Sequence, residues 1–366
     1  MAHPALHNYA VIMAGGIGER FWPMSRSYRP KQFIDILGTG KSLIRQTYDR
    51  FLEFLPRENI FVITNEKFLP LVVEHIPDID ITRIICEPTR KNTAPCVAYA
   101  SWKIHAMDPK ACLIVAPSDH VILKEKEFER IIRAAINAAS ANPWLITLGI
   151  KPSRPDTGYG YIQFKQCKPW AEDENLRKVK TFTEKPNLEL AESFIKSGDF
   201  LWNSGIFIWS SQAIIDAFEK YQPEISFVFR ECEGKYNTSR EAEYISTAFS
   251  ACKSISIDYA IMEKADNVYV IASDFGWCDL GTWGSLFELR PIDSNRNAIM
   301  GSNVLLYDST NCIVNVPNEK LVVMQGLDDY IVAESDDALL ICRKDNEQEI
   351  RRYLNDIRQK KGDTFV

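Results

Sequence analysis

The sequence has no apolar run approaching ~20 residues, the length that a membrane-spanning helix needs, so neither a transmembrane helix nor a membrane partner is expected. Residues 1–8 lack the basic start and apolar core of a secretory signal peptide. The nine cysteines are scattered, none forms C-x-x-C, and no cysteine or histidine spacing is typical of zinc. We therefore expect a cytoplasmic protein whose cysteines are mostly buried and reduced.

Two common nucleotide-binding fingerprints are absent as well. The glycines near residue 16 do not continue as G-x-G-x-x-G, because Phe21 stands where the third glycine belongs. The P-loop pattern G-x-x-x-x-G-K-[ST] is also missing. No arrangement of Ser, His and Asp or of Cys and His indicates a catalytic nucleophile. The net charge of −6 argues against a general nucleic-acid binder, so no nucleic-acid partner is expected.

The composition is that of an ordinary globular protein, with 46% hydrophobic and 25% charged residues. A chain of 366 residues is long enough for one large α/β domain and a smaller one. The charge is unevenly spread, because residues 1–50 contain seven Lys/Arg against three Asp/Glu. This local excess of positive charge favours an anionic ligand over a merely solvated loop.

The most informative stretch is residues 10–33, AVIMAGGIGERFWPMSRSYRPKQF. An apolar strand leads into a glycine-rich turn, and a basic loop with two prolines follows. The turn glycines carry no side chains that would keep an anion away from the backbone N–H groups. Such a loop suits a polyphosphate, although a Gly-Gly-x-Gly turn alone also occurs without a ligand. The glycines are Gly15, Gly16 and Gly18, and the cationic residues after them are Arg20, Arg26, Arg29 and Lys31.

The glycines, Arg20 and the segment Pro30-Lys31-Gln32-Phe33 together resemble the signature of the sugar-nucleotidyltransferases, the nucleoside-diphosphate-sugar pyrophosphorylases. With the motifs below, the resemblance is to the members that use GTP and mannose 1-phosphate. It implies these two substrates as partners and Mg²⁺ as the cofactor, and it covers residues 9–290 well. It further implies that Gly15, Gly16 and Gly18 cradle the GTP phosphates. Arg20 would hold the β/γ end, and Lys31 would stabilise charge at the α-phosphorus.

Apolar strands alternate with helical patterns along residues 1–290, which indicates an α/β fold with a Rossmann-like, mostly parallel sheet flanked by helices. After about residue 291 the pattern changes to close-set short β-like runs and a final helix at 346–358. We expect a catalytic domain at 1–290 and a β-rich domain at 291–366. The resemblance implies that the second domain is like a left-handed β-helix and serves self-association, so a homodimer is expected. Residues 165–177 are polar and predict a surface excursion.

Residues 87–95, EPTRKNTAP, lie between a predicted strand and a predicted helix. Asn92 or Thr93 can cap that helix and Pro95 suits its first turn, so this segment needs no ligand. The same polar residues would also stand at the carboxyl edge of the sheet, where open α/β folds bind ligands. The resemblance places this segment by the nucleotide base and makes Glu87, Asn92 and Thr93 candidates for binding guanine. We weigh the two interpretations about equally for each residue.

Two aspartates far apart in the sequence are candidates for the metal. Asp119 follows a strand in PSDH, and the next predicted helix begins too late for Asp119 to cap it. A carboxylate in that place suits Mg²⁺, which favours one or two carboxylates together with phosphate oxygens. Asp279 lies in GWCDLGTW and could cap a helix, a role for which Thr282 competes. The resemblance gives both aspartates to the metal, and only the fold could bring them together.

A third set of motifs concerns the sugar phosphate. Glu184 and Lys185, in an E-K-P segment at the end of a strand, could simply pair in solvent. The resemblance implies that Glu184 accepts sugar hydroxyls and Lys185 neutralises the phosphate. Gly160 would let the sugar approach the backbone, although a hairpin also explains this glycine. Asn203 has an amide that can donate and accept, or it is a turn residue. Asp258 is a weaker candidate that could merely cap a short helix.

The implied reaction is an in-line attack of mannose 1-phosphate on the α-phosphorus of GTP, giving GDP-mannose and pyrophosphate. A phosphate monoester has a second pKa near ~6, so the nucleophile is already largely dianionic at neutral pH and needs no general base. Three alternatives stay open. They are the same reaction with glucose 1-phosphate and UTP, dTTP or ATP, a non-catalytic subunit that senses a nucleotide sugar, and an interaction protein built on the β-rich tail.

Overall fold

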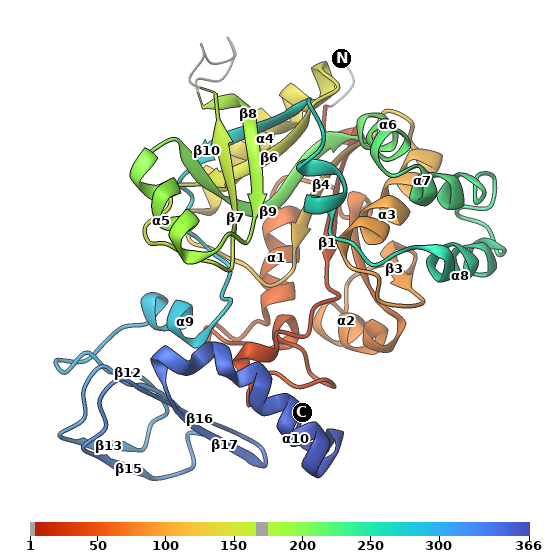
Figure 1. The fold of residues 1–366 in the computed structure, drawn as a ribbon. Coiled ribbons are helices and arrows are strands. Elements are labelled where there is room, and N and C mark those ends of the chain that lie inside the picture. The colour runs from red at the N-terminus through yellow and green to blue at the C-terminus, as the bar shows by residue number, and fades with distance from the viewer. Residues whose placement is uncertain (1–3, 166–174) are drawn as a thin grey trace. The chain divides into compact units, whose positions relative to one another are not determined.

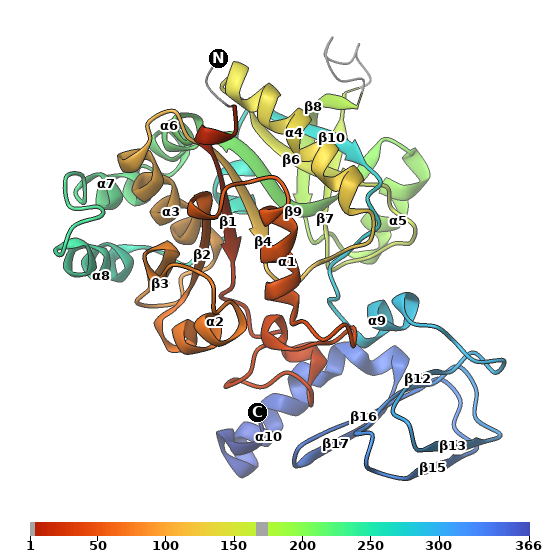
Figure 2. The same cartoon turned by 180° about the vertical axis from the view of Figure 1, so that it is seen from behind.

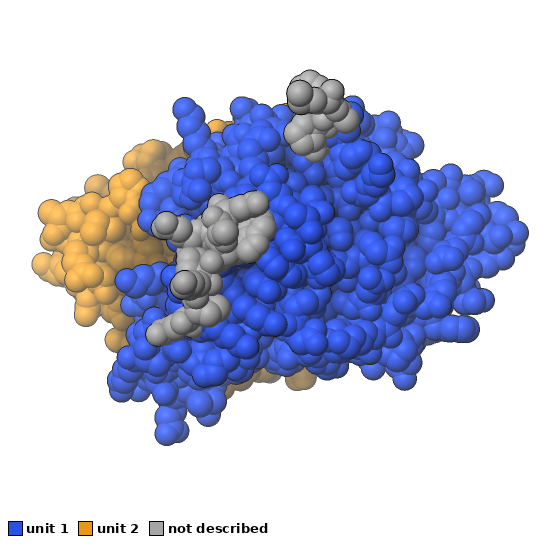
Figure 3. Space-filling view, turned by 90° about the horizontal axis from the view of Figure 1, so that it is seen from above, with its two compact units in different colours: residues 1–15, 47–118, 122–277 blue, residues 16–46, 119–121, 278–366 orange. Residues whose placement is uncertain are grey.

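The computed structural model describes residues 4–165 and 175–366, so most of the polar excursion expected at 165–177 lies outside the described residues. The chain forms two compact units, which Figure 3 colours separately. Unit 1 comprises residues 1–15, 47–118 and 122–277, and unit 2 comprises residues 16–46, 119–121 and 278–366. The residues that follow the glycine turn thus pack with the C-terminal part of the chain. The predicted domain boundary after residue 290 stays a prediction.

Unit 1 is built on a nine-stranded sheet of order β3-β2-β1-β4-β9-β6-β10-β8-β7 (Figure 1). Neighbouring strands are parallel from β3 to β4 and between β6 and β10. The sheet is mixed, because β9 runs antiparallel to β4 and β6. The strands are β1 (Asn8–Met13), β2 (Ile60–Asn65), β3 (Ile84–Glu87), β4 (Cys112–Pro117), β6 (Leu145–Ile150), β7 (Gly160–Phe164), β8 (Leu176–Glu184), β9 (Phe200–Ser210) and β10 (Val268–Ser273).

Helices cover this sheet because its strands are apolar on both faces. Tyr9 and Val11 of β1 pack into a large core with helices α3, α6, α7 and α8. Helix α4 lies against β4, β6, β9 and β10 and is best seen in Figure 2. The helices are α2 (Leu69–His75), α3 (Thr93–Met107), α4 (Glu125–Ala141), α5 (Leu188–Ser197), α6 (Ser211–Tyr221), α7 (Pro223–Arg230) and α8 (Glu241–Ala251). Helix α1 (Leu43–Leu52) has residues in both units, as do the two-residue strands β5 (Val121–Ile122) and β11 (Trp277–Cys278).

The C-terminal part of unit 2 is a short parallel coil. One sheet has the order β12-β14-β16-β17 and a second pairs β13 with β15. Ala298 pairs with Ile313 and Ile313 with Ile331, so successive coils advance by unequal numbers of residues. The strands are β12 (Ala298–Met300), β13 (Val304–Tyr307), β14 (Ile313–Asn315), β15 (Val322–Gln325), β16 (Tyr330–Ser335) and β17 (Ala338–Arg343); the helices are α9 (Trp283–Leu289) and α10 (Ile350–Lys361).

A second hydrophobic core ties the loop after the glycine turn to this coil. Phe21 and Trp22 from the loop pack with Trp283 of α9, Ile331 of β16 and Leu354 of α10. The indole of Trp283 donates to the Trp22 carbonyl at 3.3 Å. The loop therefore owes its shape to residues that lie far along the chain, which local sequence patterns cannot reveal.

The α/β class and the β-rich C-terminal part are confirmed. The expected parallel strands are present at β3-β2-β1-β4 and β6-β10, but the sheet is mixed and not mostly parallel, because β7, β8 and β9 join it through antiparallel pairings. Among the described residues no helix is long and apolar enough to cross a membrane. The eight cysteines within the described ranges are all free, as expected.

Candidate active site

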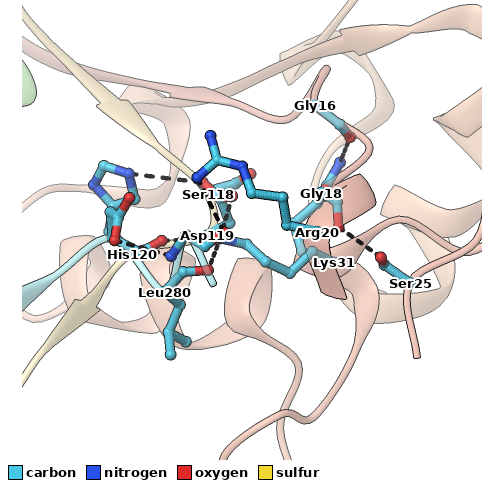
Figure 4. A network of polar contacts seen from close by, with 12 residues as sticks. Gly16, Gly18, Arg20, Ser25, Lys31, Ser118, Asp119, His120 and Leu280 are labelled. Carbon is cyan, nitrogen blue, oxygen red and sulfur yellow. Dashed lines mark hydrogen bonds and ion pairs between the residues drawn. The ribbon is translucent and has the colours of Figure 1, made fainter. Parts of the chain in front are cut away.

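The loop after β1 is held in shape by its own hydrogen bonds (Figure 4). Gly18 has a φ of +74°, which glycine adopts without strain. Its carbonyl accepts from the Ser25 hydroxyl at 2.6 Å, and the Gly16 carbonyl accepts from the Gln32 amide at 2.9 Å. A Cβ on Gly16 would meet nothing within 4 Å, so a ligand can approach this backbone. Gly15 belongs to unit 1.

Lys31 is the centre of a buried polar cluster in unit 2. Its ammonium donates to the carbonyls of Asp279 and Leu280, both at 2.9 Å, and lies 2.7 Å from the Asp119 carboxylate. An ammonium has three hydrogens, and all three have acceptors here. The Lys31 side chain is only 4% exposed. A Cβ on Gly18 would lie 2.5 Å from the Cβ of Lys31, so Gly18 leaves the space that this lysine occupies.

The arginines of the loop serve different purposes. Arg20 is partly exposed, with Nη1 3.5 Å from the Gly281 carbonyl. Burial, and then the positive charge of Arg20, lower the pKa of Arg351 in α10, so these two cations act on one another. Arg26 was expected to offer its charge to a ligand, and this expectation is wrong. Arg26 is buried and its guanidinium is paired with Asp337 at 2.9 Å.

The fold brings the two predicted metal ligands to the same lysine. Asp119 contacts Lys31 through its carboxylate and Asp279 through its main-chain carbonyl. Neither caps a helix: α4 begins at Glu125, and Thr282 caps α9. The Asp279 carboxylate accepts from the Gly281 N–H at 2.9 Å. Burial would raise the pKa of Asp119, but the charges of Lys31 and His120 outweigh it and hold the pKa below its usual value.

This donor set fits magnesium. Asp119 stays ionised and 29% of its side chain is exposed, so its oxygens can be reached. No group of three or more metal-type side chains occurs within residues 4–165 and 175–366. Mg²⁺ does not need one, because it is commonly held by one or two carboxylates with substrate phosphates completing the shell. The assignment of Mg²⁺ stays a prediction.

Glu87, in unit 1, is a buried carboxyl with an unused oxygen. The residue is 5% exposed, and its Oε1 has no hydrogen-bond partner within the described part of the chain. Burial raises the pKa of Glu87 to about 7, although a hydrogen bond with the Cys96 thiol and the charge of Arg90 both lower it. Its Oε2 would lie 3.5 Å from a Cβ built on Gly15. A buried acceptor left unpaired costs free energy, so it favours a ligand that brings an N–H donor.

Asn92 and Thr93 both have structural partners. The Asn92 side chain accepts from the Thr93 N–H and caps α3, as one of the two interpretations expected. The Thr93 hydroxyl accepts from the N–H of Ile257 at 2.8 Å. The next residue, Ala94, donates its N–H to the Ile255 carbonyl at 3.0 Å. These bonds fix the segment that leads to Asp258, and they leave a role in binding guanine as a prediction.

The residues predicted for the sugar phosphate gather at one place in unit 1. The Lys185 ammonium is paired with the Glu184 carboxylate, whose side chain is 7% exposed. A Cβ on Gly160 would lie 2.5 Å from Glu184 Oε2 and 3.4 Å from the Cβ of Asn203. The missing side chain of Gly160 is therefore space for the Glu184 carboxylate, a reason the hairpin interpretation did not provide.

Asp258 joins the same group. It begins a π-helical turn, Asp258–Met262, and does not cap it. The Asn203 amide donates to Asp258 Oδ1 at 2.9 Å, and the Thr147 hydroxyl donates to Asn203 Oδ1 at 2.9 Å. Sequence reasoning missed Thr147 and Arg351 altogether, because their partners are distant in the chain and neither stands in a recognisable motif.

Comparisons with known proteins cover nearly the whole chain. The family model described as nucleotidyl transferase matches residues 9–296, and a mannoseP isomerase/GMP-like beta-helix domain matches residues 302–356. A mannose-1-phosphate guanylyltransferase of Escherichia coli is 36% identical over 352 residues, 94% of this chain and 74% of that protein. One of Salmonella montevideo is 36% identical over 356 residues, 95% and 73% of the two chains. A Thermus thermophilus structure, described as a mannose-1-phosphate geranyltransferase, matches with a TM-score of 0.84 at 28% identity, covering 96% of this chain and 99% of that one.

Proposed function

The chain belongs to the nucleotidyl transferase family, and from this premise we propose that it transfers GMP from GTP to mannose 1-phosphate. The products are GDP-mannose and pyrophosphate. The observation that carries the proposal is the cluster in which Lys31, Asp119 and Asp279 meet beside the glycine turn. The names and high coverage of the relatives support the choice of guanine and mannose.

The reaction requires the protein to align the two substrates and to neutralise their negative charge. An oxygen of the mannose 1-phosphate dianion forms a bond to the α-phosphorus of GTP, and the bond from that phosphorus to the β-phosphate oxygen breaks. Both reactants are polyanions, so bringing them together needs fixed positive charge and oriented donors. The buried clusters offer these groups without any side chain that must first lose a proton.

Unit 2 supplies the groups assigned to the triphosphate. The open backbone at Gly16 would bind phosphate oxygens, and Arg20, in the field of Arg351, would hold the end that leaves as pyrophosphate. Lys31 would stabilise charge at the α-phosphorus. Its three hydrogens are engaged by Asp119 and two carbonyls, so Lys31 also sets the shape of the loop.

Asp119 and Asp279 would hold Mg²⁺, which supplies charge screening between the two polyanions when it is bound. In the structure the Lys31 ammonium neutralises Asp119. This pairing keeps the carboxylate ionised, and Mg²⁺ would have to bind it in competition with the charge of Lys31. Loss of Asp119 should therefore affect the cation requirement more than the affinity for the sugar.

Glu87 is the residue assigned to the guanine base. Its buried and unpaired Oε1 calls for an N–H donor, and the guanine edge presents one in its exocyclic amino group. Adenine and the pyrimidines of UTP and dTTP present different patterns of donors and acceptors. A buried acceptor that the wrong base leaves unpaired discriminates strongly. Adenine also has an exocyclic amino group, and uracil and thymine have an N3–H, so the choice of GTP over the alternative nucleotides rests on the relatives and not on Glu87.

The experiment is a pyrophosphate-release assay of the whole protein with every pair of GTP, UTP, dTTP or ATP and mannose or glucose 1-phosphate, with Mg²⁺ present. We expect release with GTP and mannose 1-phosphate at a rate well above that of the other pairs. Preference for another pair would replace the substrates but keep the reaction. No release from any pair, with GDP-mannose still bound in a calorimetric titration, would favour the sensing subunit instead.

A second copy of the chain is part of the proposal as a partner. Seven large apolar side chains between residues 298 and 343 are exposed, and three of them lie on β13 and β15. Native mass measurement at low and high protein concentration tests the homodimer. The cytoplasmic location stays a prediction. The exposed residues are Ile299, Leu305, Tyr307, Leu321, Val323, Leu339 and Ile341.

A further inference from the structure

Unit 1 contains two carboxyl groups that the reaction above does not explain as a pair, Glu184 and Asp258. They come from different elements, the end of β8 and the π-helical turn Asp258–Met262. Charge on Glu184 acts directly on Asp258. Like charges held close together are unfavourable, so proteins that build such a pair commonly keep a proton on one of its members.

The structure fixes Asp258 from two sides. The Thr93 hydroxyl accepts from the N–H of Ile257, the residue before it. The Asn203 amide donates to Asp258 Oδ1 at 2.9 Å. The orientation of this amide is not arbitrary, because its oxygen accepts from Thr147 at 2.9 Å and from the N–H of Gly205 at 3.2 Å. The carboxyl of Asp258 is thus aimed by a fully specified network.

Glu184 is positioned with similar care. The space for its carboxylate exists only because residue 160 is glycine, since a Cβ there would lie 2.5 Å from Oε2. Its Oε1 is paired with Lys185, and its N–H donates to the Glu263 carboxylate at 3.2 Å. The Lys185 side chain is 55% exposed, so the cation of this group faces outward while the acids lie further in.

We propose that Asp258 is a sugar-binding residue, and that it carries a proton beside the Glu184–Lys185 ion pair when it binds the hydroxyl groups of the hexose phosphate. This inference rests on the proposed function, because it takes Glu184, Lys185 and Asn203 as the sugar-phosphate subsite. A neutral carboxyl beside a carboxylate offers one O–H donor and several acceptors. Neighbouring hydroxyls of a hexose, each both donor and acceptor, fit such a pair.

The charge argument gives the direction of the pH dependence. Burial, then the charge of Glu184, raise the pKa of Asp258 to about 7, while Lys185 and the Asn203 amide lower it. The other charged groups that face the pair are Lys185 and Glu263. Above this pKa Asp258 is ionised, and a sugar phosphate dianion must bind beside one more negative charge. Binding of mannose 1-phosphate should therefore weaken as the pH rises through about 7.

The variant Asp258→Asn is the matched probe, because its side chain has the shape of the aspartate and is neutral at every pH. We expect KM for mannose 1-phosphate of the wild type to rise at least ~5-fold between pH 6 and pH 8.5 relative to the variant. The KM for GTP and kcat should have the same pH profile in both proteins. Dividing the two profiles removes the titration of the substrate itself, whose second pKa lies near ~6.

A direct readout does not need turnover. Titration calorimetry with mannose 1-phosphate at pH 8, in buffers of different ionisation enthalpy, should show proton uptake on binding by the wild type and none by Asp258→Asn. Asp266→Asn, at an exposed aspartate of the same unit, should behave as the wild type. If Asp258→Asn does not fold, Glu184→Gln serves, and the pH break of sugar binding should move below 7.

Equal proton uptake and equal pH profiles in the wild type and Asp258→Asn would overturn this inference while leaving the transferase intact. Absence of pyrophosphate release from every substrate pair would instead remove the proposed function. A loss of sugar affinity in Asp258→Asn that is the same at pH 6 and 8.5 would also overturn the proton on Asp258, because it would reduce Asp258 to a fixed acceptor.

Discussion

Asp119 in unit 2 and Asp258 in unit 1 each lie near a lysine, yet their pKa values move in opposite directions. Burial pushes both upward. The ammonium of Lys31 touches Asp119 directly at 2.7 Å, and the pKa of Asp119 falls below its usual value. Lys185 is paired with Glu184 instead, and the charge of Glu184 helps to raise the pKa of Asp258 to about 7. A lysine that touches an aspartate directly keeps it ionised. A lysine that is paired with a neighbouring glutamate leaves the pKa of the aspartate raised.

This contrast suits two different tasks. A carboxylate kept ionised by a buried ammonium can take a metal ion or hold a cationic group in place. A carboxyl kept near neutrality can donate to a hydroxyl and does not repel a phosphate. The two clusters also give the folded protein opposite responses to pH, because stability from Asp119 is lost as pH falls through its folded pKa, whereas stability tied to Asp258 is lost as pH rises through about 7.

Removal of Lys31 should have the largest effect, because this ammonium keeps Asp119 ionised. In Lys31→Ala the Asp119 carboxylate loses its counter-charge, so the pKa of Asp119 should rise and the loop should lose the bonds to residues 279 and 280. We expect kcat to fall by roughly 10²–10³, the range seen when an oriented charge or donor is removed from an active site. Pyrophosphate release measures it.

Two companion variants separate the causes. Lys31→Met keeps most of the side-chain volume and tests whether charge alone matters, and thermal unfolding reports whether each variant is folded. Lys31→Arg should not restore activity, because the planar guanidinium does not reproduce three bonds from one nitrogen. Turnover of a folded Lys31→Met within a few-fold of the wild type would remove Lys31 from the chemistry.

A substitution of Gly18 should act through Lys31, because the two residues are in contact. Gly18→Ala would place a Cβ 2.5 Å from the Cβ of Lys31 and would also force an alanine into a φ of +74°. We expect a loss in kcat of roughly 10²-fold, since small displacements of aligned groups are costly. Gly16→Ala, where the Cβ meets nothing within 4 Å, should affect KM for GTP more than kcat. Equal effects on kcat from both variants would contradict the steric explanation.

The metal assignment can be tested at Asp119 alone. Asp119→Asn keeps the shape and removes the charge, so the Mg²⁺ concentration for half-maximal activity should rise by about 10-fold. The variant Asp274→Asn, at an exposed aspartate outside the cluster, is the control and should leave the Mg²⁺ titration unchanged. An unchanged titration in Asp119→Asn would reject the assignment of this residue to the metal.

Much of the order of helices and strands in unit 1 followed from the sequence, because strands such as β1, β2 and β4 are short apolar runs, whereas the charged strand β8 has no such pattern. The family resemblance is confirmed by matches over nearly the whole chain. The repeat of the C-terminal coil did not follow, because its coils advance by unequal numbers of residues and no single period appears. Its handedness stays a prediction.

The individual site residues show why a sequence gives residue types more readily than their tasks. Arg26 and Arg20 look alike in the loop, but only tertiary packing shows that Arg26 is buried against Asp337. The sequence around Gly160 does not indicate its contact with Glu184. The two residues are distant in sequence and lie opposite one another on the neighbouring strands β7 and β8. Asp258 and Glu87 are ordinary acids in the sequence, and burial in the fold is what raises their pKa values to about 7.

The smallest expected effect is on the free energy of unfolding, and it concerns Glu87, a buried acid whose pKa is raised like that of Asp258. The folded-state pKa of Glu87, about 7, lies above its ordinary value of 4.5, so the folded protein binds this proton more tightly than the unfolded chain. The resulting stability is complete below about pH 4.5 and is lost as pH rises through about 7. Glu87→Gln removes the charge, so the variant should gain about 1 kcal/mol relative to the wild type between pH 5 and pH 8, below the ~3 kcal/mol that the full shift would allow. Denaturant unfolding at the two pH values measures the difference, with Glu66→Gln, at an exposed glutamate, as the control. A difference between wild type and Glu87→Gln that is the same at both pH values would mean that Glu87 is ionised in the folded protein, and that its buried oxygen has a donor already.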